Sequence, residues 1–170
     1  MKNVFYFSRF GILLCFLVTI FAFPGCKPSL LPSTNIKATR ENKQIVAFLE
    51  RYKAAVEKRS VDAVMELVAK DFSDNMGTDN PAQHLDYLGL KEKLEKYFPR
   101  ILDIRLGLFV QHAAKLRKDE YEVVFYFNKN ILTEVPSGEK WVAIKEVSRM
   151  VIRRTHAKNA PAEFEILQGI

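Results

Sequence analysis

The chain has 170 residues, which suits one domain with an additional segment. Its 26 basic and 20 acidic residues give a net charge of +6, but no dense basic block is present, which argues against nucleic-acid binding. The two cysteines, Cys15 and Cys26, are too few for a disulfide framework, and no Cys–His spacing indicates a zinc site. Linear motifs for nucleotides, calcium or serine hydrolysis are also missing, so neither metal nor cofactor is predicted.

The first 25 residues are arranged as a secretory signal peptide. Lys2 and Arg9 come first, an apolar run follows over residues 10–23, and Gly25 precedes the break. As a helix this run would span ~21 Å, less than the ~30 Å of a hydrocarbon core. Cleavage is therefore predicted, with a membrane-spanning anchor and an ordinary secreted protein carrying a stray cysteine as the alternatives.

The residues at the break resemble a bacterial lipoprotein signal, because Gly25 is a small residue directly before Cys26. The resemblance implies that Cys26 carries acyl chains such as palmitate and becomes the N-terminus of a protein held at the bacterial cell envelope. Lys27 stands where an aspartate favours the inner membrane, which favours the outer one. Residues 26–38 contain prolines and no periodicity, and they are predicted to form a lipidated tether.

From residue 39 the apolar spacing predicts helices at about 39–58 and from Ser60, then a third helix that Pro99 ends. The first helical face contains Ile45, Phe48, Leu49, Tyr52, Ala55 and Val56. Two short strands, at 72–76 and 85–88, are predicted between the second and third helices.

Four strands are predicted in the remaining chain, at residues 104–116, 121–127, 141–154 and 164–167. In the first of them the apolar even positions lead to His112. In the third strand Glu146 and Ser148 share the face of apolar residues. That strand also carries Arg149, Arg153 and Arg154, which are expected to be solvated or to face an acidic partner or anionic lipid.

Helices followed by long antiparallel strands predict an α+β fold, in which a curved sheet packs against about three N-terminal helices. Strands this long usually bend, so the sheet and helices should form a cone around a cavity. Three stretches resemble the nuclear transport factor 2-like superfamily, which includes ketosteroid isomerase-like and SnoaL-like proteins. They are FLERYKAAVEKRSVDAVMELVAKDF (48–72), LKEKLEKYF (90–98) and FEILQGI (164–170). The resemblance covers residues 39–170 and implies a cone-shaped α+β barrel around a pocket.

The resemblance also suggests candidate site residues. Tyr52 matches the tyrosine that donates a hydrogen bond to an oxyanion in ketosteroid isomerase-like enzymes. The position of the catalytic base falls near Met76, which cannot take a proton, with Asp74 close by. Glu146 is a candidate for the second oxyanion donor. Each has a structural alternative, because Tyr52 can be a core aromatic and Glu146 can be paired or turned outward.

The pocket candidates are therefore Tyr52, His112, Glu146 and Ser148, where His112 can equally be a structural histidine of the rim or core. The incomplete catalytic set favours a non-catalytic domain that binds a small apolar ligand or a protein partner. The alternative is a pocket enzyme of the isomerase or dehydratase type that uses Tyr52 and a carboxylate. Family members often dimerise through the outer face of the sheet. The strand at residues 121–127 is apolar on both faces, which suits a homodimer.

Overall fold

The computed structural model describes residues 29–75, 77–78, 84–156 and 162–170. The strands are β1 (Ser73–Asp74), β2 (Leu85–Asp86), β3 (Ile101–Lys115), β4 (Glu120–Val135), β5 (Gly138–Arg154) and β6 (Phe164–Gln168). The helices are α2 (Arg40–Glu57), α3 (Val61–Met65), α4 (Tyr87–Tyr97) and the 3-10 turn η2 (Phe98–Arg100).

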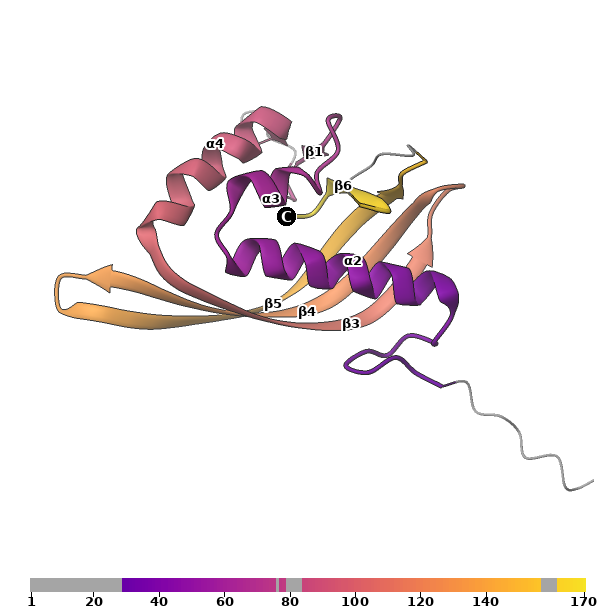
Figure 1. The fold of residues 1–170 in the computed structure, drawn as a ribbon, viewed down its shortest axis with the longest axis horizontal. Helices are drawn as coiled ribbons and strands as arrows, with labels where there is room; N and C mark the ends of the chain where they lie inside the picture. Colours follow the sequence, from indigo (N-terminus) through magenta and orange to yellow (C-terminus); the bar gives the residue numbers. More distant parts are fainter. Residues whose placement is uncertain (1–28, 76, 79–83, 157–161) are drawn as a thin grey trace, which may run out of the picture.

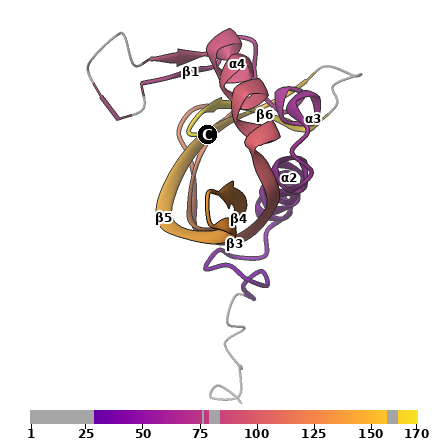
Figure 2. The same ribbon diagram turned by 90° about the vertical axis from the view of Figure 1, so that its left-hand side faces the viewer.

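The long strands form one antiparallel sheet in the order β3-β4-β5-β6, and β1 pairs only with β2. The sheet curves, and the helices lie on its concave side (Figures 1 and 2). The predicted α+β fold, a curved antiparallel sheet packed against helices, is confirmed.

Side-chain caps set where the helices begin. The Thr39 hydroxyl accepts the N–H of Asn42 at 3.1 Å, and Ser60 accepts that of Ala63 at 3.2 Å. Between α2 and α3 the chain reverses at Arg59, which adopts a left-handed conformation with φ of 54°. The second helix is short, and Val68 pairs as an isolated bridge with Ile166 instead of continuing it.

Strand β3 contains a bulge that changes which residues face the helices. Val110 is paired with Phe125, but the register shifts before His112, which is paired with Val124. One additional residue reverses the alternation of side chains. His112 is consequently exposed on the outer face of the sheet, so the prediction that it lines the pocket is wrong.

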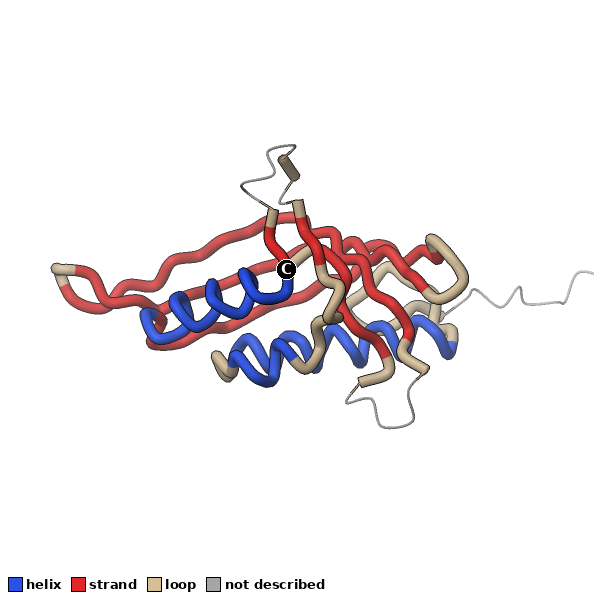
Figure 3. Tube along the Cα trace, turned by 90° about the horizontal axis from the view of Figure 1, so that it is seen from above, coloured by secondary structure: helices blue, strands red, loops and turns tan. Residues whose placement is uncertain are grey.

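Strands β4 and β5 are longer than predicted. The strand expected to end at residue 127 continues to Val135, and its pairing with β5 runs without interruption to Gly138. The hairpin projects beyond the helices (Figures 1 and 3). Pairing with β5 therefore keeps the polar sequence 128–130 in strand conformation.

Residues 29–38 pack onto the domain instead of forming the predicted tether. Asn35 donates its N–H to the carbonyl of Val110 at 2.8 Å, and Thr34 forms a parallel bridge with the same residue. Thr34 and Ile36 are 7% and 6% exposed. Since β3 is an edge strand, this segment covers part of its free edge.

The described core lies between α2, α3, α4 and the concave face of the sheet, and its largest buried side chains include Leu49, Leu90, Phe125 and Phe164. Its residues all fall between Ile36 and Ile166, so a chain of residues 29–170 contains this whole core. In the described part of the chain no helix is both long enough and apolar enough to span a membrane. The predicted signal peptide and Cys26 lie outside the described residues.

Candidate binding cavity

A cavity of about 350 Å³ lies between the concave face of the sheet and the helices. Its walls are largely apolar and include Val56 and Val64 on the first two helices, Leu90 on α4, and Phe127 and Ile131 on β4. Its size and apolar character are typical of sites for small molecules. Six of its side chains bear a hydroxyl or a charge, and they come from four different elements: Tyr52, Lys93, Tyr97, Lys129, Glu146 and Ser148.

The register of β4 and β5 places three of the polar side chains along one row of the sheet. Ser148 is opposite Phe125, Glu146 is opposite Phe127, and Lys129 is opposite Ile144. Alternate residues of a strand point to the same face, so all of these side chains lie on the inner face. Glu146 is nevertheless exposed, which places it at the opening of the cavity.

Tyr52 reaches the cavity from the buried face of α2 and is 6% exposed. Among the described residues none forms a hydrogen bond with its hydroxyl, and none of their fully buried side-chain N or O atoms lacks a partner. The hydroxyl is therefore open to the cavity. Burial raises the pKa of Tyr52, and the negative charge of Glu146 raises it further. Tyr52 consequently remains a neutral hydrogen-bond donor at physiological pH.

Asp74 supports the wall of the cavity without lining it. Its Oδ2 atom accepts the N–H of Gly169 at 3.0 Å, and Gly169 lies against the cavity. Gly169 has a φ of 86°, and a Cβ atom there would lie 1.9 Å from the carbonyl oxygen of Arg149. Asp74 thus fixes a glycine segment that no other residue type would fit. Met76, near the expected position of a base, lies outside the described residues.

The three arginines of β5 are engaged within the molecule. Arg149 pairs with Glu122, and Arg153 pairs with Asp71 and Glu165. The remaining one, Arg154, pairs with Glu163 and has its guanidinium 4.6 Å from the ring centroid of Phe164. Arg149 is 64% exposed, as the solvated alternative expected, whereas Arg153 and Arg154 are largely covered by these contacts.

The charged lining residues that sequence reasoning missed are Lys93 and Lys129. Lys93 occupies a helical position between Leu90 and Leu94, so the apolar period of α4 contained the signal. Lys129 continues the odd-numbered inner face of β4, but the strand had been predicted to end at Phe127.

The arrangement can bind an apolar molecule and donate a hydrogen bond to an oxygen of that molecule from Tyr52. Glu146 can accept a proton or a hydrogen bond at the same cavity. In the described part of the chain no group of His, Cys, Asp or Glu could hold a metal ion.

No protein-family model matches the chain, and no curated protein matches it. Several solved structures are similar to it in fold. A ketosteroid isomerase-like protein from Erwinia carotovora atroseptica has a TM-score of 0.57 and 14% identity, covering 77% of this chain and 94% of that one. A protein from Streptomyces avermitilis, described as a candidate dehydratase of the NTF2-like family, has a TM-score of 0.60 and 16% identity, with coverage of 75% and 92%.

An NTF2-like superfamily protein from Salmonella enterica has a TM-score of 0.58 and 12% identity, covering 75% of this chain and 86% of that one. At these identities the likeness shows the fold alone. The chain has the fold of the nuclear transport factor 2-like proteins, with a cavity inside its curved sheet.

Proposed function

We propose that this protein is a non-catalytic binding domain that takes a small, mainly apolar ligand into the cavity of its NTF2-like fold. The observation that carries the proposal is the cavity itself. It is apolar on most of its wall, and the hydroxyl of the buried Tyr52 opens into it without a hydrogen-bond partner among the described residues. A vacant donor in an apolar cavity is suited to a ligand that presents one oxygen.

The test uses residues 29–170 and decanol as a neutral probe. Calorimetry should detect decanol binding to the unaltered domain. Ser148→Trp should abolish it by filling the cavity, while the folded state persists in a thermal melt. Leu116→Trp is a matched control, because Leu116 is exposed in the loop that joins β3 and β4. Equal binding to the unaltered and Ser148→Trp domains would overturn the proposal.

A second candidate, an enzyme of the isomerase or dehydratase type, is favoured by one observation. Tyr52 and Glu146 line the same cavity, where a tyrosine could stabilise an enolate oxygen while a carboxylate takes the proton from carbon. Deuterium exchange into 2-decanone in D₂O tests this chemistry directly. An enzyme should accelerate exchange next to the carbonyl, and Glu146→Gln should remove the acceleration. A binding domain should leave the exchange rate unchanged.

The proposal includes a lipid on Cys26 that holds the domain at the bacterial cell envelope. The outer membrane is the proposed location, because Lys27 stands where an aspartate would favour the inner membrane. Its support is the signal-like N-terminus. Because Ser29 already begins the packed segment, three residue steps separate it from Cys26, a reach of ~10 Å. The domain would then lie directly against the bilayer. Mass spectrometry of the full-length protein should show acyl chains that Cys26→Ala removes, and unchanged lipidation would contradict the proposal.

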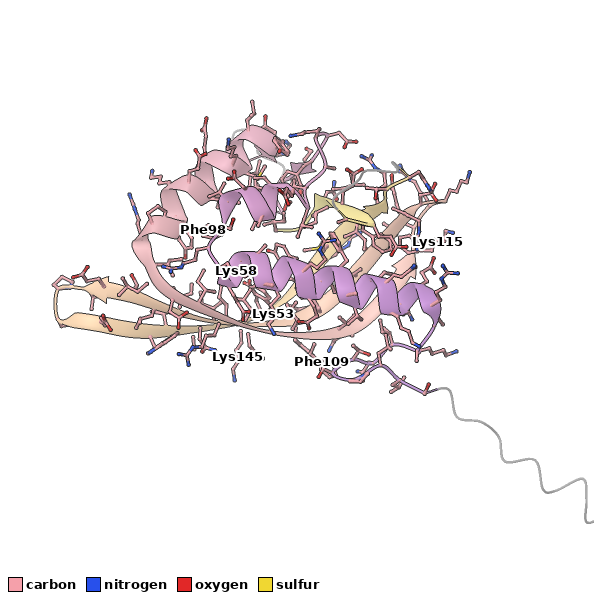
Figure 4. All side chains as sticks on the ribbon, viewed as in Figure 1. Lys53, Lys58, Phe98, Phe109, Lys115 and Lys145 are labelled. Carbon is pink, nitrogen blue, oxygen red and sulfur yellow. The ribbon has the colours of Figure 1, made fainter. Side chains whose placement is uncertain are left out.

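The proposal also includes a homodimer, which would form through the outer face of the sheet. Tyr126 and Val147 are 45% and 59% exposed there, and the ring centroid of Phe109 is 6.4 Å from that of Tyr126 (Figure 4 labels Phe109). An exposed apolar cluster favours a partner. Sedimentation should show a dimer that Val147→Glu dissociates, and a monomer at high concentration would exclude this form.

A further inference from the structure

The cavity has a cation on each of two facing walls, and both interrupt otherwise apolar surfaces. On α4 the cavity side is formed by Leu90, Leu94 and Tyr97, and Lys93 lies among them at helical spacing. A lysine on the solvent side of a surface helix would be unremarkable. Lys93 lines the cavity, and its position therefore suggests a use there.

On the sheet wall Lys129 stands in a row of buried side chains, between Phe127 and Ile131. Its neighbours across the strands are Leu106 and Ile144, both apolar. Lys129 is half-buried, and its Nζ atom lies 5.5 Å from the ring centroid of Phe127. The ammonium is thus held close to the apolar wall by its contact with an aromatic ring.

None of the ion pairs in the described part of the chain involves Lys93, Lys129 or Glu146. Glu146 lines the same cavity, but it is not paired with either lysine. Two cations therefore remain available to a ligand at this end of the cavity. An anionic group of the ligand would be attracted more strongly here than at a fully exposed site, because the surroundings are partly apolar.

The order of the charges along the sheet orients that ligand. Along β5, Glu146 lies two residues from Ser148 and two residues from Ile144, the residue opposite Lys129. Repulsion by Glu146 is therefore about equal at both levels, and the attraction of the lysines places a ligand anion at the end that holds Lys129. The levels of Ser148 and Lys129 are four residues apart along β5, or ~13 Å at ~3.3 Å per residue.

We infer that the ligand is an elongated amphipathic carboxylic acid, whose carboxylate lies between Lys93 and Lys129 while its apolar body extends toward Tyr52 and Ser148. This inference rests on the proposed function and specifies its ligand class. The vacant Tyr52 hydroxyl can donate to a further oxygen on the apolar body, but the lysines alone select the acid.

The test compares decanoate with decanol, which share an alkyl chain and differ in the charged end. Calorimetry on residues 29–170 gives the dissociation constants of both. The ratio of the decanoate constant to the decanol constant should rise about tenfold or more in Lys93→Gln/Lys129→Gln, as expected for the loss of one charge contact with the half-buried Lys129 and one with the exposed Lys93. Decanol binding should change by less than about twofold, because the apolar contacts remain.

Lys96→Gln/Lys145→Gln is the matched control. This variant also removes two positive charges, one from α4 and one from the sheet. Neither lysine lines the cavity, and Lys145 lies on the outer face of the sheet (Figure 4). The control should leave the ratio unchanged. Lys93→Glu/Lys129→Glu should lose decanoate binding and gain binding of decylammonium, which a nonspecific loss of structure cannot produce.

The outcomes separate the two proposals. If decanol binds but the ratio is the same in every variant, the cavity is a binding site and the acid inference is wrong. If neither probe binds to the unaltered domain, the proposed function fails and the inference fails with it. A ratio that rises equally in the control would also overturn the inference, because general charge would then explain it.

Discussion

The two ends of strand β5 carry charged residues in opposite ways. Toward its C-terminal end, Arg153 donates to both carboxylate oxygens of Asp71, at 2.7 and 2.8 Å, and to Glu165. Toward the hairpin, Glu146 lines the cavity and forms no ion pair with the described residues, and neither does Lys129 on the adjacent strand. The charges at one end of β5 are thus paired within the fold, whereas those at the other end are not paired with any described residue.

Replacing Arg153 should give the largest difference in stability between the two ends of β5. Arg153→Gln should lower the free energy of unfolding by about 1–3 kcal/mol, because it removes charge-assisted hydrogen bonds from two carboxylates. Lys129→Gln should change it by less than about 0.5 kcal/mol, as expected for a lysine without a partner. Urea denaturation of both variants provides the measurement. Equal losses would mean that the cavity charges are structural as well.

Arg153 should also contribute to the fall in the free energy of unfolding at acidic pH. Its hydrogen bonds hold the pKa of Asp71 below the ordinary value, which burial offsets only in part. The folded state therefore binds fewer protons than the unfolded state at mildly acidic pH, and stability falls as the pH drops from about 5 through the lowered pKa. Arg153→Gln should flatten this decline, measured by denaturation between about pH 3 and pH 6. An unchanged slope would show that Asp71 does not contribute.

Replacing Glu146 should produce the smallest effect of these changes, and the effect should be confined to the cavity. Glu146→Gln should lower the pKa of Tyr52, because the carboxylate charge helps to raise it. The pKa should remain above the ordinary tyrosine value, since burial is the larger cause. A carbon-13 NMR titration of the tyrosine ring carbon that bears the hydroxyl can follow it. No change at all would place Glu146 outside the electrostatic environment of Tyr52.

Local sequence rules predicted the helical side of the fold well, because each helix carries its own signals. The spacing from Ile45 to Val56 and the cap at Thr39 placed α2 within about one residue of its observed bounds. The third helix begins earlier than expected, at Tyr87, because the Asp86 side chain accepts the N–H of Gly89 and caps it.

The errors fall where contacts distant in sequence decide the structure. The bulge that turns His112 outward depends on the register with β4, which alternation within β3 cannot reveal. Likewise, Lys129 belongs to the cavity because β5 keeps a polar stretch in strand conformation, and Thr34 is buried because it meets the edge of β3. Tyr52, Glu146 and Ser148 could be expected from their apolar faces, whereas Lys129 could be placed at the cavity only once the β4–β5 hairpin was known.

The most direct test of the central claim is methyl NMR of residues 29–170 titrated with decanol. Shifts should concentrate on cavity methyls such as those of Leu90, Leu94 and Ile131, and exposed methyls of the outer face such as Val147 should stay unchanged. Shifts centred on Val147, or none at saturating decanol, would contradict the claim that this cavity binds the ligand.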